Sequence, residues 1–224
     1  MTGTLFVVAT PIGNLEDISG RALRVLREVD VIACEDTRRT RALLAHFEIH
    51  TPTVSYYEHN KLTRGRELLR QLGEGRSVAL VTDAGTPGIS DPGFMLVRDA
   101  RAAGVPVVPV PGPAALAAVL SAAGVPAGRF VFDGFLPIKA GRRLNRLAFL
   151  RDLDMTIVLY ESPHRILATL EAIATTFGDR PIVVAREVTK QFEEIVRAPA
   201  AAHHARLTAA GARGEFAVVI PAHE

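Results

Sequence analysis

The chain has 224 residues, 48% of them hydrophobic, which is enough to bury a sizeable core and excludes a disordered tail. Its 26 Lys and Arg against 24 Asp and Glu leave a formal net charge of +2, which decides neither for nor against a nucleic-acid partner. The single cysteine, Cys34, excludes an intrachain disulfide and a cysteine-based zinc cluster.

The N-terminal stretch "MTGTLFVVATPIGN" has no basic region before its apolar run and meets a Pro-Ile-Gly break early, so it predicts no signal sequence. The most apolar helical stretch, which starts at Ala114, is too short to cross a bilayer. Together with the lone cysteine, these features predict a cytoplasmic protein without a membrane partner or a metal.

Short apolar runs alternate with amphipathic stretches through the first half of the chain. The strands are expected at 4–9, 30–35, 53–57, 77–82 and 105–110, and the helices at 20–29, 37–47, 64–72 and 91–103. This alternation is typical of a parallel sheet with crossover helices.

A second series follows the stretch "PGPAALAAVLSAAG". Its strands are expected at 130–135, 155–160, 181–186, 192–198 and 215–220, and its helices at 142–153 and 163–177. The short connection between 181–186 and 192–198 predicts a hairpin and hence a mixed sheet. The chain is therefore predicted to hold two α/β domains, 1–112 and 113–224, packed closely with a cleft between them.

The segment "DAGTPGISDPG", residues 83–93, packs glycines and prolines directly after a buried strand. Ser90 or Asp91 before Pro92 predicts a helix start, and Gly85 and Gly88 permit close backbone approaches. Alone, such a segment is equally well explained as a tight strand-to-helix turn. Two further strands end in similar turns, "ATPIGN" and "VPGPAAL", so the three turns are expected to line one crevice.

The order of these motifs resembles the tetrapyrrole methylase superfamily and, within it, the bacterial small-subunit ribosomal RNA (cytidine-2′-O)-methyltransferases. The matching stretches span the chain: "ATPIGNLEDIS", "CEDTR", "HN" at 59–60, "DAGTPGISDPG", "VPGPAAL", "GFLPIKAGRR", "YESPHR", "AREVTKQFEE" and "GEFAVVI". Members of the family commonly continue into a small helical domain after the last strand. Because this sequence stops at "AHE", the resemblance implies a catalytic core without that extension.

The resemblance implies that S-adenosylmethionine binds in the cleft, held mainly by backbone. Carried over position by position, its contacts fall on Pro11, Gly85, Thr86, Pro87, Ile89, Pro113, Ala114, Ala115 and Tyr160. A side chain at position 85 is then expected to block the cofactor while the protein stays folded.

Methyl transfer to a ribose hydroxyl needs an in-line approach and a group that takes the hydroxyl proton. Candidates are Glu35, Asp36, His59 and Asp83. Glu35 and Asp36 lie at a strand end, Asp83 opens the glycine-rich segment, and an imidazole such as that of His59 suits proton transfer near neutrality. Three of them have a structural alternative: Asp36 suits a helix cap, His59 a helix start, and Asp83 a turn. The resemblance favours functional roles for Glu35 and for Arg38.

Basic residues supply the candidates for contact with the RNA backbone. They are Lys139, Arg142, Arg143 and Arg146 in "IKAGRRLNR", with Arg165, Arg186 and Lys190 further on, and Asn60 as a hydrogen-bonding partner. A solvated helix face explains the first cluster equally well, and an ion-pair network explains the residues around Arg186.

The resemblance implies 2′-O-methylation of a cytidine in the decoding region of small-subunit ribosomal RNA, by a homodimer acting on the assembled subunit. One alternative is a precorrin-type C-methyltransferase of the same fold. Another is a ribosome-binding module with weak catalysis.

Overall fold

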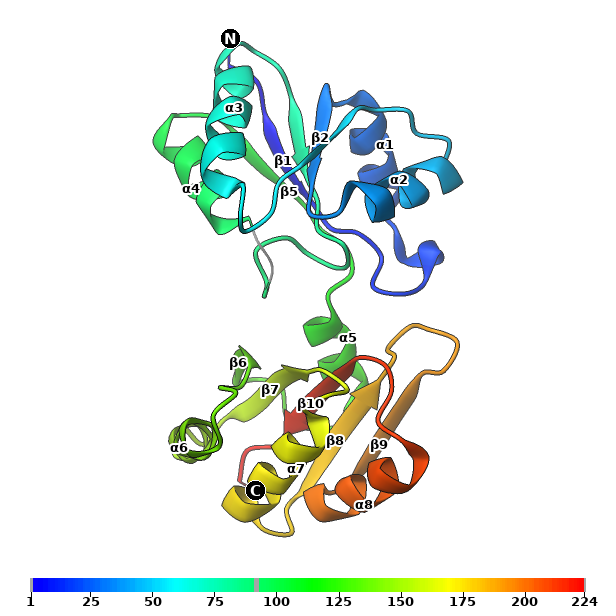
Figure 1. The fold of residues 1–224 in the computed structure, drawn as a ribbon, viewed down its shortest axis with the longest axis vertical. Coiled ribbons are helices and arrows are strands. Elements are labelled where there is room, and N and C mark those ends of the chain that lie inside the picture. Colours follow the sequence, from blue (N-terminus) through cyan, green and yellow to red (C-terminus); the bar gives the residue numbers. More distant parts are fainter. Residues whose placement is uncertain (1, 91–92, 224) are drawn as a thin grey trace. The chain divides into compact units, whose positions relative to one another are not determined.

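The computed structural model describes residues 2–90 and 93–223. The chain divides into two compact units, Met1–Ala114 and Ala115–Glu224, each built around a five-stranded sheet with helices (Figure 1). The first sheet is parallel and the second is mixed, which confirms the predicted fold class.

The strands of the first unit lie in the order β3-β2-β4-β1-β5. Their bounds are β1 (Leu5–Val8), β2 (Val31–Cys34), β3 (Thr53–Ser55), β4 (Val78–Leu80) and β5 (Val107–Val110). The helices are η1 (Leu15–Asp17), α1 (Gly20–Glu28), α2 (Thr37–His46), α3 (Lys61–Gly73) and α4 (Phe94–Ala102). Every neighbouring strand pair is parallel, so all carboxyl ends meet at one edge of the sheet.

Alternation along the strands sends side chains to two separate cores. Ile32 and Cys34 pack on the face that α1 and α2 cover, and Val31 and Ala33 pack on the face covered by α3 and α4. A strand covered on both faces reads as a continuous apolar run, as "VIAC" does.

The second unit has the strand order β6-β7-β10-β8-β9. Its strands are β6 (Phe130–Phe135), β7 (Thr156–Glu161), β8 (Pro181–Arg186), β9 (Glu194–Pro199) and β10 (Phe216–Ile220). Its helices are α5 (Ala115–Ala122), α6 (Ala140–Arg151), α7 (Ile166–Phe177) and α8 (Ala200–Ala210). The pair β6–β7 is parallel, and the hairpin β8–β9 is antiparallel as predicted.

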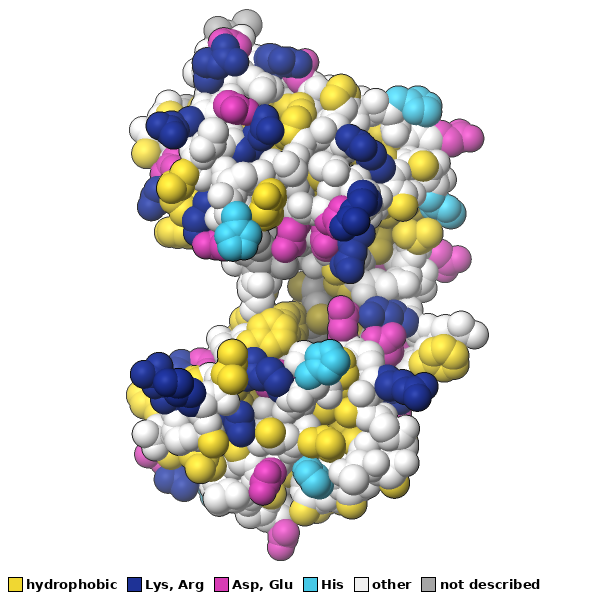
Figure 2. Space-filling model, in the orientation of Figure 1, with side chains coloured by type: hydrophobic (Ala, Val, Ile, Leu, Met, Phe, Trp, Pro, Cys, Tyr) yellow, Lys and Arg dark blue, Asp and Glu magenta, His cyan; other side chains and the backbone are white. Residues whose placement is uncertain are grey.

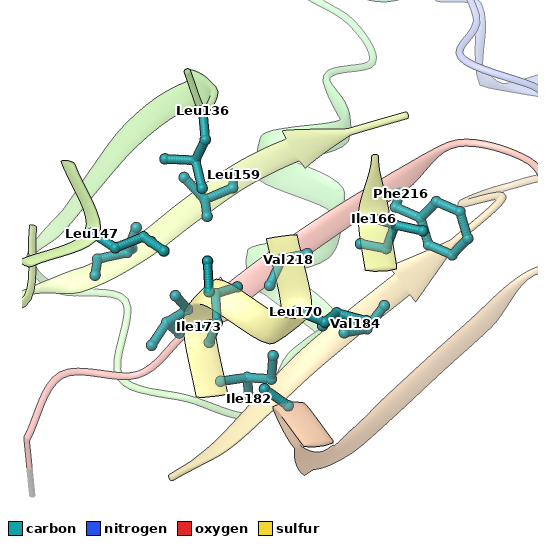
Figure 3. Close-up of a cluster of buried hydrophobic side chains, with 14 of the residues drawn as sticks. Leu136, Leu147, Leu159, Ile166, Leu170, Ile173, Ile182, Val184, Phe216 and Val218 are labelled. Atoms are coloured by element: carbon teal, nitrogen blue, oxygen red, sulfur yellow. The ribbon is translucent and has the colours of Figure 1, made fainter. Parts of the chain in front are cut away.

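One face of the second sheet carries the larger core, beneath α6, α7 and α8 (Figure 3). Leu147, Leu170 and Leu207 from these three helices are at most 1% exposed. The other face packs against α5, whose Val119 is fully buried. Both faces of this sheet are therefore covered by helices as well.

Two features differ from the sequence-based expectations or fall outside them. Helix α8 was not expected, although Pro199 precedes its alanine-rich sequence and Gly211, at φ +79°, follows it. The expected helix start at Asp91–Pro92 lies outside the described residues, and α4 begins at Phe94 without a side-chain cap from Gly93. None of the helices among the described residues combines the length and the apolar character needed to span a bilayer.

Candidate functional site

Three glycine- and proline-rich turns follow adjacent strands of the first unit. In the order β4-β1-β5 the strand ends are level, since Val7 pairs with Leu80 and Val8 with Val110. The turns 9–14, 81–90 and 111–114 therefore leave the sheet side by side, as the sequence predicts.

Direct hydrogen bonds join the first two turns. The Thr10 N–H donates to the Gly85 carbonyl at 2.9 Å, and the Gly85 N–H donates back to the Thr10 carbonyl at 3.1 Å. The buried Thr10 hydroxyl donates to the Thr82 carbonyl at 3.1 Å. This reciprocal pair fixes the start of the long loop against the end of β1.

The third turn is tied to the same loop. The Thr86 hydroxyl donates to the Pro113 carbonyl at 3.0 Å. A Cβ added at Gly112 would lie 3.0 Å from the Ala9 Cβ, so this turn also presses closely on the end of β1. The Thr86 side chain thus has a structural role whether or not a ligand is present.

Gly85 is required by the backbone itself. Its φ is +89°, and an added Cβ would meet the Ile12 side chain at 3.3 Å and the Pro113 carbonyl at 3.7 Å. A side chain at position 85 therefore strains the backbone even without a ligand, and the expectation that it blocks the cofactor in a folded protein stays a prediction. Gly88 differs: its φ is +85°, but a Cβ there would meet nothing within 4 Å.

The remaining residues predicted to hold a cofactor divide between the units. In the first, Pro11 and Pro87 are buried, while Ile89, Pro113 and Ala114 are half-buried. In the second, Ala115 starts α5 and Tyr160 lies in β7.

Within the second unit, Tyr160 is held close to the start of α5. Its hydroxyl accepts a hydrogen bond from the Leu116 N–H at 2.8 Å, and its ring contacts Phe132 edge-on with centroids 4.8 Å apart. The structure thus brings Tyr160 and Ala115 into one neighbourhood.

Three carboxylates gather at the ends of β2 and β4. Asp83 accepts the Asp36 N–H at 3.0 Å and pairs with Arg39 at 3.3 Å, while Glu35 accepts the Thr82 hydroxyl at 3.5 Å. Burial raises the pKa of the Glu35 carboxyl above its ordinary 4.5, and the charge of Asp83 acts in the same direction. The Glu35 carboxylate is therefore more basic than an ordinary glutamate.

Asp36 is a helix cap. Its Oδ1 accepts the Arg38 N–H at 2.8 Å at the start of α2, and its two oxygens accept from the Arg38 guanidinium at 3.1 and 2.7 Å. The hydrogen bonds from Arg38 hold the pKa of Asp36 well below its usual range. A helix-capping role for Asp36 accounts for all of these contacts. The Arg38 guanidinium is engaged by the same carboxylate.

His59 and Asn60 lie in the turn between β3 and α3. Asn60 accepts the Tyr57 N–H at 2.8 Å and donates to the Ser55 carbonyl at 3.1 Å, so its side chain ties this turn together. His59 is exposed, with its ring edge-on to Tyr57. Strand β2 separates β3 from β4, so the structure does not bring His59 next to Asp83.

The basic cluster of α6 is not uniform. Lys139 and Arg142 are exposed, whereas Arg143 is only 9% exposed and donates to the Ile138 carbonyl at 3.1 Å. Arg146 forms an ion pair with Asp133 of β6. The expectation of a common phosphate-gripping face thus needs correction, because burial withdraws Arg143 from the surface.

Ion pairs occupy the other predicted RNA contacts. Arg165 pairs with the buried Glu161 at 3.5 Å, and Arg186 lies 4.0 Å from Glu194. Lys190 donates to Glu187 and to Glu215, both at 2.9 Å. The ion-pair network that the sequence left open is present.

Comparison with known proteins identifies the family of this chain. The model of the tetrapyrrole (corrin/porphyrin) methylases matches residues 4–203. This chain belongs to that family. The resemblance read from the motifs is thereby confirmed.

Relatives among these methylases share about half of their residues with the chain. One from Pseudomonas aeruginosa, named ribosomal RNA small subunit methyltransferase I, is 55% identical over 203 residues, which is 90% of this chain and 72% of the relative. Another of the same name, from Halalkalibacterium halodurans, is 48% identical over 220 residues, 97% of this chain and 75% of the relative.

Solved structures of tetrapyrrole methylase-like proteins share the fold. A diphthine synthase superposes with a TM-score of 0.77 at 18% identity, over 99% of this chain and 92% of that one. A uroporphyrin-III C-methyltransferase from Thermus thermophilus, complexed with S-adenosyl homocysteine, gives a TM-score of 0.66 at 21% identity over 97% of both chains.

Proposed function

We propose that this protein transfers the methyl group of S-adenosylmethionine to the ribose 2′-hydroxyl of a cytidine in the decoding region of small-subunit ribosomal RNA. The observation that carries this proposal is the similarity to the relatives from Pseudomonas and Halalkalibacterium, both named ribosomal RNA small subunit methyltransferase I. Identity of about one half extends over 90% and 97% of the chain in these two relatives.

The joined turns of the first unit suit the methyl donor. Small residues and ring-locked prolines leave backbone within reach of a ligand, and the space beyond Gly88 is open. When bound, S-adenosylmethionine supplies an electrophilic methyl group on a sulfonium. We assign its contacts to Pro11, Gly85, Thr86, Pro87, Ile89, Pro113 and Ala114, with Ala115 and Tyr160 as contacts from the second unit.

Glu35 is our candidate for the group that accepts the 2′-hydroxyl proton. Asp36 is engaged in the α2 cap and with Arg38, and Asp83 holds the Asp36 N–H and Arg39. Among the described residues, the hydrogen bond that Glu35 accepts is the 3.5 Å contact with Thr82, and its pKa is raised, so Glu35 combines availability with basicity. Asp83 then acts on Glu35 through its charge.

Exposed cations on the second unit are our candidates for the RNA backbone. Lys139 and Arg142 meet this requirement, since guanidinium and ammonium groups bind phosphate by charge-assisted hydrogen bonds. His59 and Asn60 remain candidates for the substrate side of the first unit. We further propose that the enzyme works as a cytoplasmic homodimer on the assembled small subunit.

The test uses methyl-tritiated S-adenosylmethionine with three acceptors: assembled small subunits from a strain lacking the modification, naked small-subunit RNA, and a corrinoid precursor. Label in a cytidine 2′-O-methyl group of the RNA is the expected result. Label in the corrinoid would replace the proposal with C-methylation. RNA binding without label would point to a binding module.

A further inference from the structure

Two arginine side chains from different elements reach the segment between β6 and α6. Arg143, in the first turn of α6, donates from Nη1 to the Ile138 carbonyl at 3.1 Å. Arg165, which precedes α7, donates from Nη2 to the Leu136 carbonyl. The motifs "GFLPIKAGRR" and "YESPHR", separate in the sequence, thus meet at one stretch of backbone.

The inner side of this stretch is anchored by Leu136. Its side chain is 2% exposed and points toward Leu159 in the core (Figure 3). Leu136 is therefore held twice, by its side chain in the core and by its carbonyl on Arg165.

Much of both guanidiniums is withdrawn from solvent, although the Arg165 side chain is 25% exposed. Arg143 is 9% exposed, and its Nε has no hydrogen-bond partner among the described residues. The buried Nε of Arg165 likewise has none, although its guanidinium pairs with Glu161, which Thr169 holds at 2.7 Å. Burying a cation without full compensation costs free energy, so retaining Arg143 beneath this loop indicates a gain elsewhere.

The outer side of the same stretch presents apolar and basic groups together. Ile138 is 78% exposed and Phe135 is 51% exposed. Neither Lys139 nor Arg142, both exposed, forms an ion pair with another described residue. In the space-filling view, basic and hydrophobic side chains lie next to one another over the region of β6 and α6 (Figure 2).

We propose that residues 135–142, from the end of β6 through the β6–α6 loop into the first turn of α6, form a binding surface for a single-stranded RNA segment, and that Arg143 and Arg165 are positioning residues that fix the course of the loop from the inner side. This proposal rests on the proposed function. Lys139 and Arg142 bind phosphates, and Phe135 and Ile138 contact the face of an unstacked base.

The chemistry of the surface selects this partner. Unpaired cations complement a polyanion, and the buried Arg143 adds positive charge beneath them. An exposed aromatic ring in the same short stretch of chain is what a splayed-out base stacks on, whereas double-stranded RNA offers mainly phosphates and 2′-hydroxyls. Methylation of a 2′-hydroxyl also needs a nucleotide that can turn toward the enzyme.

The first experiment measures the loop without RNA. Limited trypsin digestion of the full-length protein, followed by mass spectrometry, gives the rate of cleavage after Lys139. Arg143→Met is expected to raise this rate on the order of tenfold, because the freed loop opens locally. Arg165→Lys, which keeps a charge for Glu161, is expected to raise it less. Arg151→Met, at the far end of α6, is the matched control and leaves it unchanged.

The second experiment measures RNA. Arg143→Met is expected to raise KM for small-subunit RNA about tenfold with kcat nearly unchanged, and Arg143→Lys restores part of the loss. The affinity for S-adenosylmethionine, measured by calorimetry, stays at the wild-type value. The double variant Lys139→Gln with Arg142→Gln is expected to raise KM by a similar factor, without faster trypsin cleavage at other sites. If Arg143→Met fails to fold, this double variant still tests RNA binding by the loop.

Two results overturn the proposal. Unchanged cleavage in a folded Arg143→Met protein shows that the arginines do not hold the loop. Faster cleavage with an unchanged KM shows that the loop does not bind RNA. A wild-type protein that methylates no ribosomal RNA overturns the proposed function and the RNA role together, while the trypsin result still decides the positioning role.

Discussion

At the scale of single residues, the local environment separates groups that look equivalent in the sequence. Glu35 and Asp36 are adjacent, yet the pKa of Glu35 is raised by burial and that of Asp36 is lowered by hydrogen bonds from Arg38. The two carboxylates therefore differ in availability: Asp36 is committed to the helix, and Glu35 is not. A sequence lists both as acidic residues at a strand end.

Glu35→Gln should lower the rate of methyl transfer about 10²- to 10⁴-fold while leaving the affinity for S-adenosylmethionine unchanged. In the wild type, kcat/KM should rise with pH through a midpoint above 4.5, because the ionised form is active and burial raises the pKa. This rise of kcat/KM with pH should be absent in the Glu35→Gln variant. A raised carboxyl pKa also means that ionisation disfavours the folded state, so Glu35→Gln should not destabilise the protein at pH 7. A fully active variant would remove Glu35 from the reaction.

Gly85→Ala should lower the free energy of unfolding by roughly 1–3 kcal/mol, because φ is +89° and the new Cβ would crowd Ile12. Gly88→Ala should cost less, since only its φ of +85° opposes a side chain. Urea denaturation of each variant gives the comparison. The control is Gly73→Ala at the end of α3, where a Cβ meets nothing within 4 Å and φ is not positive. Equal losses at 85 and 88 would contradict the role of Ile12.

At the scale of elements, caps and turns place the candidate groups. The Asp36 cap sets the first residue of α2, and the Asp83 carboxylate holds the N–H of that cap. The end of β2, the start of α2 and the turn after β4 are thus one hydrogen-bonded unit.

Asp36→Ala should destabilise the fold by removing the α2 cap, whereas Asp36→Asn should keep the cap and most of the methyl-transfer rate. Since the pKa of Asp36 is lowered, its charge contributes stability above its ordinary 3.8 that is lost as the pH falls through the lower folded value. In thermal melts between pH 2 and 7, the Tm of Asp36→Asn should therefore fall less toward acid pH than the Tm of the wild type. An inactive but stable Asn variant would show that the carboxylate takes part in the reaction.

At the scale of the whole molecule, charge is distributed rather than concentrated. The net charge is only +2, and many of the arginines are neutralised by neighbouring carboxylates, as Arg24 is by Glu28. Attraction to a polyanion therefore has to come from a few local cations and not from the overall field.

Lys139→Gln combined with Arg142→Gln should reduce the slope of log K against log salt for single-stranded RNA by about 0.7 per lost contact. Filter binding between 50 and 200 mM salt, roughly the range over which such slopes are resolved, measures it. Arg24→Gln with Arg70→Gln is the control, since both arginines already pair with Glu28 and Glu74. An unchanged slope in the first double variant would exclude these cations as phosphate contacts.

The sequence by itself determined the ten strands, most of the helices and the glycine- and proline-rich turns that follow three of the strands, because hydrophobic periodicity and turn residues are local signals. It missed α8, whose Ala-rich run lacks a strong amphipathic pattern. Only the tertiary structure decided which charges are free: Arg143 is buried, Arg142 is exposed, and Asp36 is a cap beside an available Glu35. The physical reason is that burial and pairing depend on residues far apart in the chain, such as Asp83 with Asp36 or Arg165 with Leu136.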